Sequence, residues 1–378
     1  MNAAADIEKE IAGQKHILEP LKAAILSKTQ PHAQLFIDEN GYGGLPLALY
    51  CAILLLYSQE QLADKLQQKN VSFHRLLEHP DFHALFPLAQ VKSADTKSFF
   101  QQWLKFVNLN PYASYTQWLS HADLGVKQGI IPVKEIQTLQ SSLSLTSFLG
   151  GNRVCVIWGL DKMNETASNK ILKLLEEPPS NTYFLLVAQL KSSLLPTIIS
   201  RCQFIDMPPV DLDSIQQFVA FKKLNPPHNF DLRTSRGSVS QLIDILNLTT
   251  HNKPIEQLFV EFLRNSFDFG KNHFKWHKLL KTIDKITLLQ KENQKGLLLI
   301  GIELLRQAYL TNCELNSLVY HQSESGFNLT RFAPYVHERN YIQMIKVIED
   351  HITYLIRNSH SHMVFTSIAL KLSSLLYL

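Results

Sequence analysis

The sequence is poor in cysteine. Only four cysteines occur among its 378 residues, at positions 51, 155, 202 and 313, and no two of them stand at a C-x-x-C spacing. Thiols this far apart are not the pattern of a disulfide framework or of a zinc site built from thiolates. We therefore expect neither feature.

Long hydrophobic runs are also missing. No apolar stretch reaches the roughly 18 to 20 residues that span a bilayer, and the polar start MNAAADIEKE does not resemble a signal peptide. These absences predict a cytoplasmic protein without membrane contact.

A dense stripe of lysine and arginine is absent as well. The formal net charge is only +4, which permits contact with nucleic acid without arguing for it. The composition, 45% hydrophobic and 19% charged, is that of a globular protein. A chain of this length predicts two or three domains.

The most informative stretch of the chain runs from 154 to 206. Residues 154–158 and 183–187 are short, continuous apolar runs, as expected of strands covered on both faces. Between them, residues 164–177 have apolar positions at helical spacing, and Pro178 and Pro179 end the helix because proline lacks the N–H donor. Two such strands joined through a helix predict a parallel βαβ unit.

Two strings in this stretch carry a resemblance. Leu-Leu-Glu-Glu-Pro-Pro at 174–179 and Leu-Leu-Pro-Thr-Ile-Ile-Ser-Arg-Cys at 194–202 closely resemble the clamp-loader branch of the AAA+ family. The resemblance implies an α/β AAA+ P-loop-like core, with a parallel sheet and flanking helices, then a small helical lid and an all-α C-terminal collar domain. The implied boundaries are 1–207, 208–250 and 251–378.

The resemblance also assigns a role to Ser200, Arg201 and Cys202. In this branch the Ser-Arg-Cys motif reaches into the nucleotide site of a neighbouring subunit, and Arg201 matches the arginine finger. A guanidinium suits that role, since it stays charged and its planar fork can meet a phosphate with two hydrogen bonds. The alternative is that Arg201 only caps the carbonyls of the preceding helix.

The family's phosphate-binding loop falls on residues 38–46, where its chemistry is lost. A working P-loop needs a lysine for the phosphates and a serine or threonine hydroxyl for Mg²⁺, but Gly44 and Leu45 stand at those positions. Asp38 and Glu39 would also repel a triphosphate. Gly41, Gly43 and Gly44 keep only the role of a tight turn into the next helix.

The acidic motif is lost too. Trp158 and Gly159 occupy the positions of the two acids that hold Mg²⁺ and activate water, and Asp161 lies two residues too far on to replace them. Ala188 or Gln189 falls at the polar sensor, and residues 237–241 lack the arginine that reads nucleotide from the lid. The combined losses predict a subunit that does not hydrolyse ATP and holds no cofactor.

The family often inserts a zinc module after the first core helix, but cysteines are absent there. His74, His79 and His83 are spaced too loosely for a structural zinc site, so we expect no bound metal. We expect His79-Pro80-Asp81 to form a turn in which Asp81 bonds local amides, followed by a strand at 84–87.

These features predict a non-hydrolysing subunit of the bacterial clamp loader. The resemblance implies as partners the loader's ATPase (tau/gamma) and delta subunits, and, through the complex, the sliding clamp and primer-template DNA. The helical stripes after Ile255 predict the collar, and Phe332-Ala333-Pro334 with Arg357-Asn358 resemble Bacteroidetes-type members. The alternatives are an independent AAA+ ATPase with divergent motifs and a DNA-binding adaptor.

Overall fold

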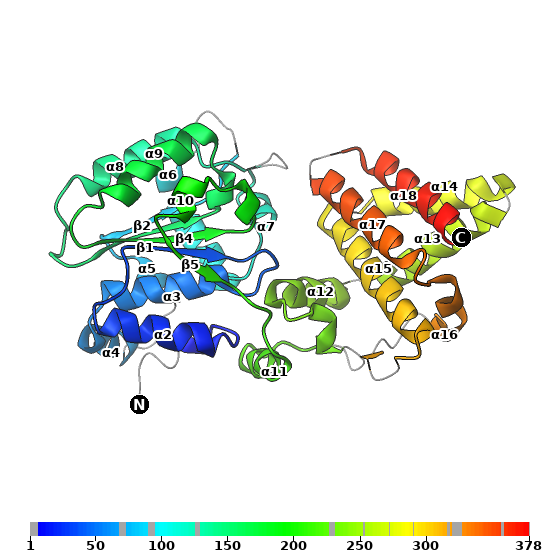
Figure 1. Cartoon of the computed structure of the whole chain (residues 1–378), viewed down its shortest axis with the longest axis horizontal. Helices are drawn as coiled ribbons and strands as arrows, with labels where there is room; N and C mark the ends of the chain where they lie inside the picture. Colours follow the sequence, from blue (N-terminus) through cyan, green and yellow to red (C-terminus); the bar gives the residue numbers. More distant parts are fainter. Residues whose placement is uncertain are drawn as a thin grey trace. The chain divides into compact units, whose positions relative to one another are not determined.

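The computed structural model divides into two compact units (Figure 1). The first unit comprises Met1–Leu224 and Ser235–Gln241, and the second comprises Asn225–Thr234 and Leu242–Leu378. The residues that the structure describes are 7–67, 73–89, 95–124, 129–226, 231–251, 254–271, 273–289, 291–315, 318–319, 327–356 and 359–377. Arg357 and Asn358 lie outside them, so the Bacteroidetes-type resemblance stays a prediction.

The first unit is built on a five-stranded sheet in the order β2-β3-β4-β1-β5. Every pairing is parallel. The strands are β1 (Ala33–Ile37), β2 (Phe82–Leu85), β3 (Arg153–Trp158), β4 (Thr182–Ala188) and β5 (Gln203–Asp206). The predicted βαβ unit is confirmed, since β3 and β4 are adjacent parallel strands joined through α9 (Glu165–Glu176).

Helices cover both faces of this sheet. Successive strand residues point to opposite faces: Val154 and Val156 of β3 belong to one hydrophobic cluster, and Cys155 and Ile157 belong to the other. The first face packs on α2 (Lys15–Leu26), α3 (Gly44–Leu56), α6 (Thr96–Leu109) and α7 (Tyr115–His121); the second packs on α8 (Val133–Leu143), α9 and α10 (Pro196–Ile199). This double coverage explains the continuous apolar runs of the strands.

The helix α3 is the most deeply buried of the helices around this sheet. Twelve of its residues are buried and only Leu54 is partly exposed. Among the described residues no single helix is long and apolar enough to cross a membrane. The pair of α3 with Gln59–Lys65 passes that test only jointly, across a 109° bend.

An aromatic cluster joins α6 and α7 to the end of β2. Phe86 stacks on Trp103 with ring centroids 5.0 Å apart, and Trp118 lies 5.2 Å from Phe86 and 5.4 Å from Phe106. The sequence predicted this strand at 84–87, which is wrong by two residues, because β2 spans Phe82–Leu85. Phe86 and Pro87 have already left the ladder, where the Pro87 carbonyl accepts a hydrogen bond from Trp118 Nε1 at 2.8 Å.

Short helices complete the first unit. They are α4 (Gln59–Gln67), α5 (Phe73–Leu77) and α11 (Leu212–Phe221), with 3-10 turns at Leu160–Lys162 and Lys191–Ser193. The chain then enters α12 (Val239–His251), whose first residues belong to the first unit and whose remainder belongs to the second.

The second unit is helical throughout its described residues. Its longer helices, α13 (Pro254–Lys271), α14 (Trp276–Thr287), α15 (Lys291–Asn312), α17 (Tyr341–Ile356) and α18 (Ser361–Leu375), enclose one hydrophobic core. Its shorter elements are η4 (His273–Lys275), α16 (Leu329–Phe332) and η6 (Ala333–Tyr335), and η3 (Leu232–Ser235) begins in this unit and ends in the first. A parallel sheet with flanking helices and a helical C-terminal region is the predicted fold class, which is confirmed.

Candidate functional site

The loop after β1 is closed by one of its own side chains. Asp38 follows the last residue of β1, and its carboxylate turns back to accept hydrogen bonds from the N–H groups of Tyr42 (2.6 Å), Gly43 (3.0 Å) and Gly44 (2.7 Å). Burial raises the pKa of Asp38, and these backbone donors oppose the rise. In a phosphate-binding loop such N–H groups cradle the anion. Here the carboxylate occupies them.

The backbone of the loop leaves little room for a lysine. Gly41 and Gly43 have φ of +76° and +118°, in the left-handed region that favours glycine. A Cβ atom on Gly44 would lie 2.8 Å from the Cβ of Asp38. A side chain at position 44, lysine included, would therefore require Asp38 to move from its present position.

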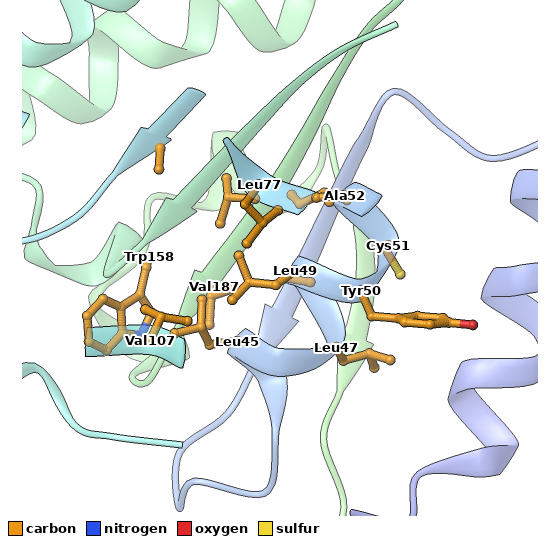
Figure 2. Close-up of a cluster of buried hydrophobic side chains, with 14 of the residues drawn as sticks. Leu45, Leu47, Leu49, Tyr50, Cys51, Ala52, Leu77, Val107, Trp158 and Val187 are labelled. Carbon is orange, nitrogen blue, oxygen red and sulfur yellow. The ribbon is translucent and has the colours of Figure 1, made fainter. Parts of the chain in front are cut away.

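Buried apolar side chains stand at two positions where the resemblance leads us to expect polar groups for Mg²⁺. Leu45 is 4% exposed and Trp158 is 3% exposed, and both belong to the buried cluster around α3 (Figure 2). The ring of Trp158 lies 4.8 Å from that of Tyr115. Neither residue offers a ligand to Mg²⁺, which prefers oxygen donors.

Gly159, which the resemblance aligns with a catalytic acid, has a backbone that disfavours any larger residue. Its φ is +89°, and a Cβ atom there would lie 2.7 Å from Cγ of Pro87. The nearby Asp161 is already engaged, since its Oδ1 accepts hydrogen bonds from the Gln189 N–H (3.1 Å) and the Tyr115 hydroxyl (3.3 Å). Lys162 Nζ lies 2.9 Å from its Oδ2.

The segment 237–240 packs directly on the same loop. Ser238 Oγ donates to the Asn40 carbonyl at 2.5 Å, and the Ser240 N–H donates to the Gly41 carbonyl at 3.2 Å. A Cβ atom on Gly41 would lie 2.3 Å from the Cβ of Ser240. The loop is thus closed from this side as well.

The Ser-Arg-Cys motif follows α10 and leads into β5. Arg201 Nη1 donates to the Thr197 carbonyl at 2.9 Å, and Nη2 lies 2.7 Å from Oε1 of Glu176, the last residue of α9. The carbonyl contact is the one expected of a helix cap. The side chain is nevertheless 36% exposed, so an external anion can reach the guanidinium.

Ser200 bonds a carbonyl of its own helix, and the thiol of Cys202 is largely buried. Ser200 Oγ donates to the Thr197 carbonyl at 3.1 Å. Burial raises the pKa of the Cys202 thiol to about 11, so the thiol stays protonated at neutral pH and is not a nucleophile.

The structure keeps Arg201 apart from the closed loop of its own chain. Gln203 of β5 pairs with Gln34 of β1, so Arg201 lies beside the start of β1, whereas Asp38 follows its end. Along the strand direction, Arg201 and Asp38 are therefore about six residues apart, which at about 3.3 Å per residue is roughly 20 Å. Arg201 therefore faces outward from the other end of the sheet.

Of the histidines considered for zinc, His79 has a contact within the chain. His79 Nδ1 accepts a hydrogen bond from the Asp81 N–H at 3.1 Å, and burial lowers the pKa of both His79 and His83. The side chain of His74 lies outside the described residues. Among those that are described, no group of three histidine, cysteine or acidic residues is placed to hold a metal ion. The absence of zinc stays a prediction.

The expected partners of Asp81 were wrong. Its two carboxylate oxygens accept from the N–H groups of Phe148 (2.8 Å) and Leu149 (3.1 Å), which are distant in sequence. Sequence reasoning also missed the seat of Asp38 and the pairing of Glu176 with Arg201. The acidic pair in the 174–179 string was the available signal for the latter.

Residues 13–211 match the family model described as DNA polymerase III, delta subunit. Curated proteins named DNA polymerase III subunit delta' include one from Haemophilus influenzae, 42% identical over 73 residues, covering 19% of this chain and 22% of that protein. Another from Bacillus subtilis is 30% identical over 129 residues, covering 33% and 39%. The chain therefore spans well under half the length of these curated relatives.

Solved structures give more distant similarities. A DNA polymerase III gamma subunit-related protein from Thermotoga maritima is 13% identical, with a TM-score of 0.42 and coverage of 94% of this chain and 98% of that one. The Bacillus subtilis DNA clamp loader delta protein is 9% identical, with a TM-score of 0.30 and coverage of 96% and 100%.

Proposed function

Because the chain belongs to the DNA polymerase III delta subunit family, we propose that it acts as a non-hydrolysing, delta-prime-type stator of a clamp loader. In this role it helps to load the sliding clamp on primed DNA in the cytoplasm. Its partners are the loader's ATPase (tau/gamma) and delta subunits, and through them the clamp and primer-template DNA. The three-domain division at 1–207, 208–250 and 251–378 belongs to the same proposal.

The observation that carries this proposal is the seat of Asp38. Three N–H groups that would receive a phosphate are already bonded to the chain's own carboxylate. Trp158 and Gly159 supply no acid to hold Mg²⁺ or to activate water. An independent AAA+ ATPase needs all of these groups at once, so that alternative is not favoured.

Within this role Arg201 serves a neighbour. A finger supplied in trans stabilises the charge that develops on the transferred phosphoryl group and raises the rate by about 10³ to 10⁵ in well-studied GTPases. The exposure of Arg201 and its separation from the closed loop of its own chain support action on another subunit.

Reconstitution with the ATPase and delta subunits tests the proposal. Size-exclusion chromatography should show one complex containing wild-type protein or Arg201→Ala, because the side chain is not part of a folded core. The Arg201→Ala complex should lose part of its DNA- and clamp-stimulated ATP hydrolysis, since only the neighbouring site depends on this arginine. Arg201→Lys should rescue poorly because lysine lacks the planar fork.

The cap alternative predicts another result. Arg201→Ala would then lose on the order of 1 kcal/mol of unfolding free energy and keep wild-type hydrolysis in the complex. That combination would refute the finger.

A further inference from the structure

Arg201 is held in the free chain by a carboxylate with no other described partner. Glu176 Oε1 lies 2.7 Å from Arg201 Nη2, and the two side chains are 45% and 36% exposed. The second anchor of the guanidinium, the Thr197 carbonyl, is uncharged. Glu176 is therefore the anion that balances this cation before any partner arrives.

Glu176 presents to the guanidinium the same kind of group that a phosphate presents. A planar carboxylate and a tetrahedral phosphate each offer two anionic oxygens that accept N–H donors in a forked geometry. Glu176 lies against one of the two nitrogens that form the outer edge of the guanidinium, and a phosphate bound by a two-bond fork along that edge needs N–H groups from both of them. A phosphate from a neighbouring subunit must therefore compete with Glu176 for Nη2.

A carboxylate that remained bound would also weaken a finger. The catalytic value of the finger is its positive charge beside developing negative charge, and an adjacent carboxylate cancels much of that charge. Because both side chains are exposed to water, their pairing is weak enough to exchange and alters an equilibrium by only about two- to five-fold.

Resting on the function proposed above, we propose that Glu176 is a latch for Arg201. It holds the guanidinium between the ends of α9 and α10 in the unassembled chain, and it releases the guanidinium when a nucleotide phosphate in the neighbouring subunit replaces the carboxylate. Glu176 thereby raises the ATP concentration that is needed before Arg201 joins the neighbouring ATP site.

The chain offers a matched control. Glu177 adjoins Glu176 and is also exposed, and its carboxylate makes no ion pair with residues that the structure describes. Glu176→Gln and Glu177→Gln remove the same charge from the same end of α9. Only the first removes the partner of Arg201.

The isolated protein tests whether the latch exists. Phenylglyoxal modifies free guanidinium groups, and mass spectrometry of the peptide containing Arg201 follows its rate. Glu176→Gln should raise the rate at Arg201 by about two- to five-fold, and Glu177→Gln should leave it at the wild-type value. Equal rates in all three proteins would overturn the latch without bearing on the finger.

The reconstituted loader tests what the latch controls. Glu176→Gln should lower the KM for ATP by about two- to five-fold with little change in kcat, and Glu177→Gln should match wild type. The change should vanish in an Arg201→Ala background. A raised KM or a lowered kcat in Glu176→Gln would mean that Glu176 orients Arg201, and would overturn the latch. Unchanged hydrolysis in Arg201→Ala alone would overturn the proposed function itself.

Discussion

Asp38 has a structural role in the loop after β1. It sits at the end of β1, is 9% exposed and satisfies three N–H groups at the start of α3. An unsatisfied buried donor costs about 1–3 kcal/mol. The loop therefore owes its closed form to a contact that also stabilises the unit.

Asp38→Ala should lower the free energy of unfolding by at least about 2 kcal/mol, because it leaves three loop N–H groups without their acceptor. Urea denaturation measures the difference. The matched control is Glu39→Ala, an exposed neighbour, which should stay within about 0.5 kcal/mol of wild type. Equal stability of the two variants would contradict the role of Asp38.

Restoring a catalytic acid should fail for a steric reason. In Gly159→Asp the new Cβ meets Cγ of Pro87 at 2.7 Å, and an L-residue must adopt φ near +89°. The expected cost is about 1–3 kcal/mol, read as a lower melting temperature, with no gain of ATP hydrolysis. Wild-type stability would show that this backbone tolerates an acid.

At the scale of elements, the sequence predicts the regular structure well. The apolar runs identify β3 and β4, and the proline pair marks the end of α9. The boundary of β2 was wrong because Phe86 is as apolar as a strand residue, although it serves the aromatic cluster.

The contacts between distant segments could not be predicted in the same way. Asp81 bonds the N–H groups of Phe148 and Leu149, and Glu176 meets Arg201 across 25 positions of sequence. Both contacts depend on how separate elements pack, which periodicity does not encode. The closed loop depends on the φ angles of Gly41 and Gly43, so its glycines were a signal but its seated carboxylate was not.

The contact between α17 and α18 should depend on pH. His351 is 1% exposed; its Nδ1 lies 2.6 Å from the Val347 carbonyl, and its Nε2 lies 2.9 Å from Ser367 Oγ. Burial lowers its pKa. The unfolded chain then binds the proton more readily, so this histidine's contribution to stability is complete above about pH 6.5 and declines below it.

An NMR titration should place the His351 ring below the ordinary histidine pKa, with His351→Gln identifying the signal. Unfolding free energies of the two proteins, compared at pH 7.5 and pH 5.5, should show a smaller loss on acidification in the variant. A pKa at or above 6.5 would contradict the buried, neutral imidazole.

For the whole molecule, the closed loop after β1 and the exposed Arg201 differ in whether an external anion can reach them. The carboxylate of Asp38 occupies the N–H groups of the loop after β1, and the guanidinium of Arg201 is exposed at the other end of the same sheet. This distribution is the one expected of the proposed stator, which would bind no nucleotide productively and would contribute to a site in another subunit. The helical second unit gives the predicted collar a core of its own.

The most direct measurement is a calorimetric titration of the isolated protein with ATP in the presence of Mg²⁺. Asp38 in its seat, Leu45 and Trp158 in the core, and Gly159 in place of an acid together predict no saturable heat at micromolar nucleotide and no hydrolysis. Gly44→Lys should behave in the same way, because one lysine restores neither metal ligand nor catalytic acid. Tight binding of ATP that requires Mg²⁺ would contradict the account.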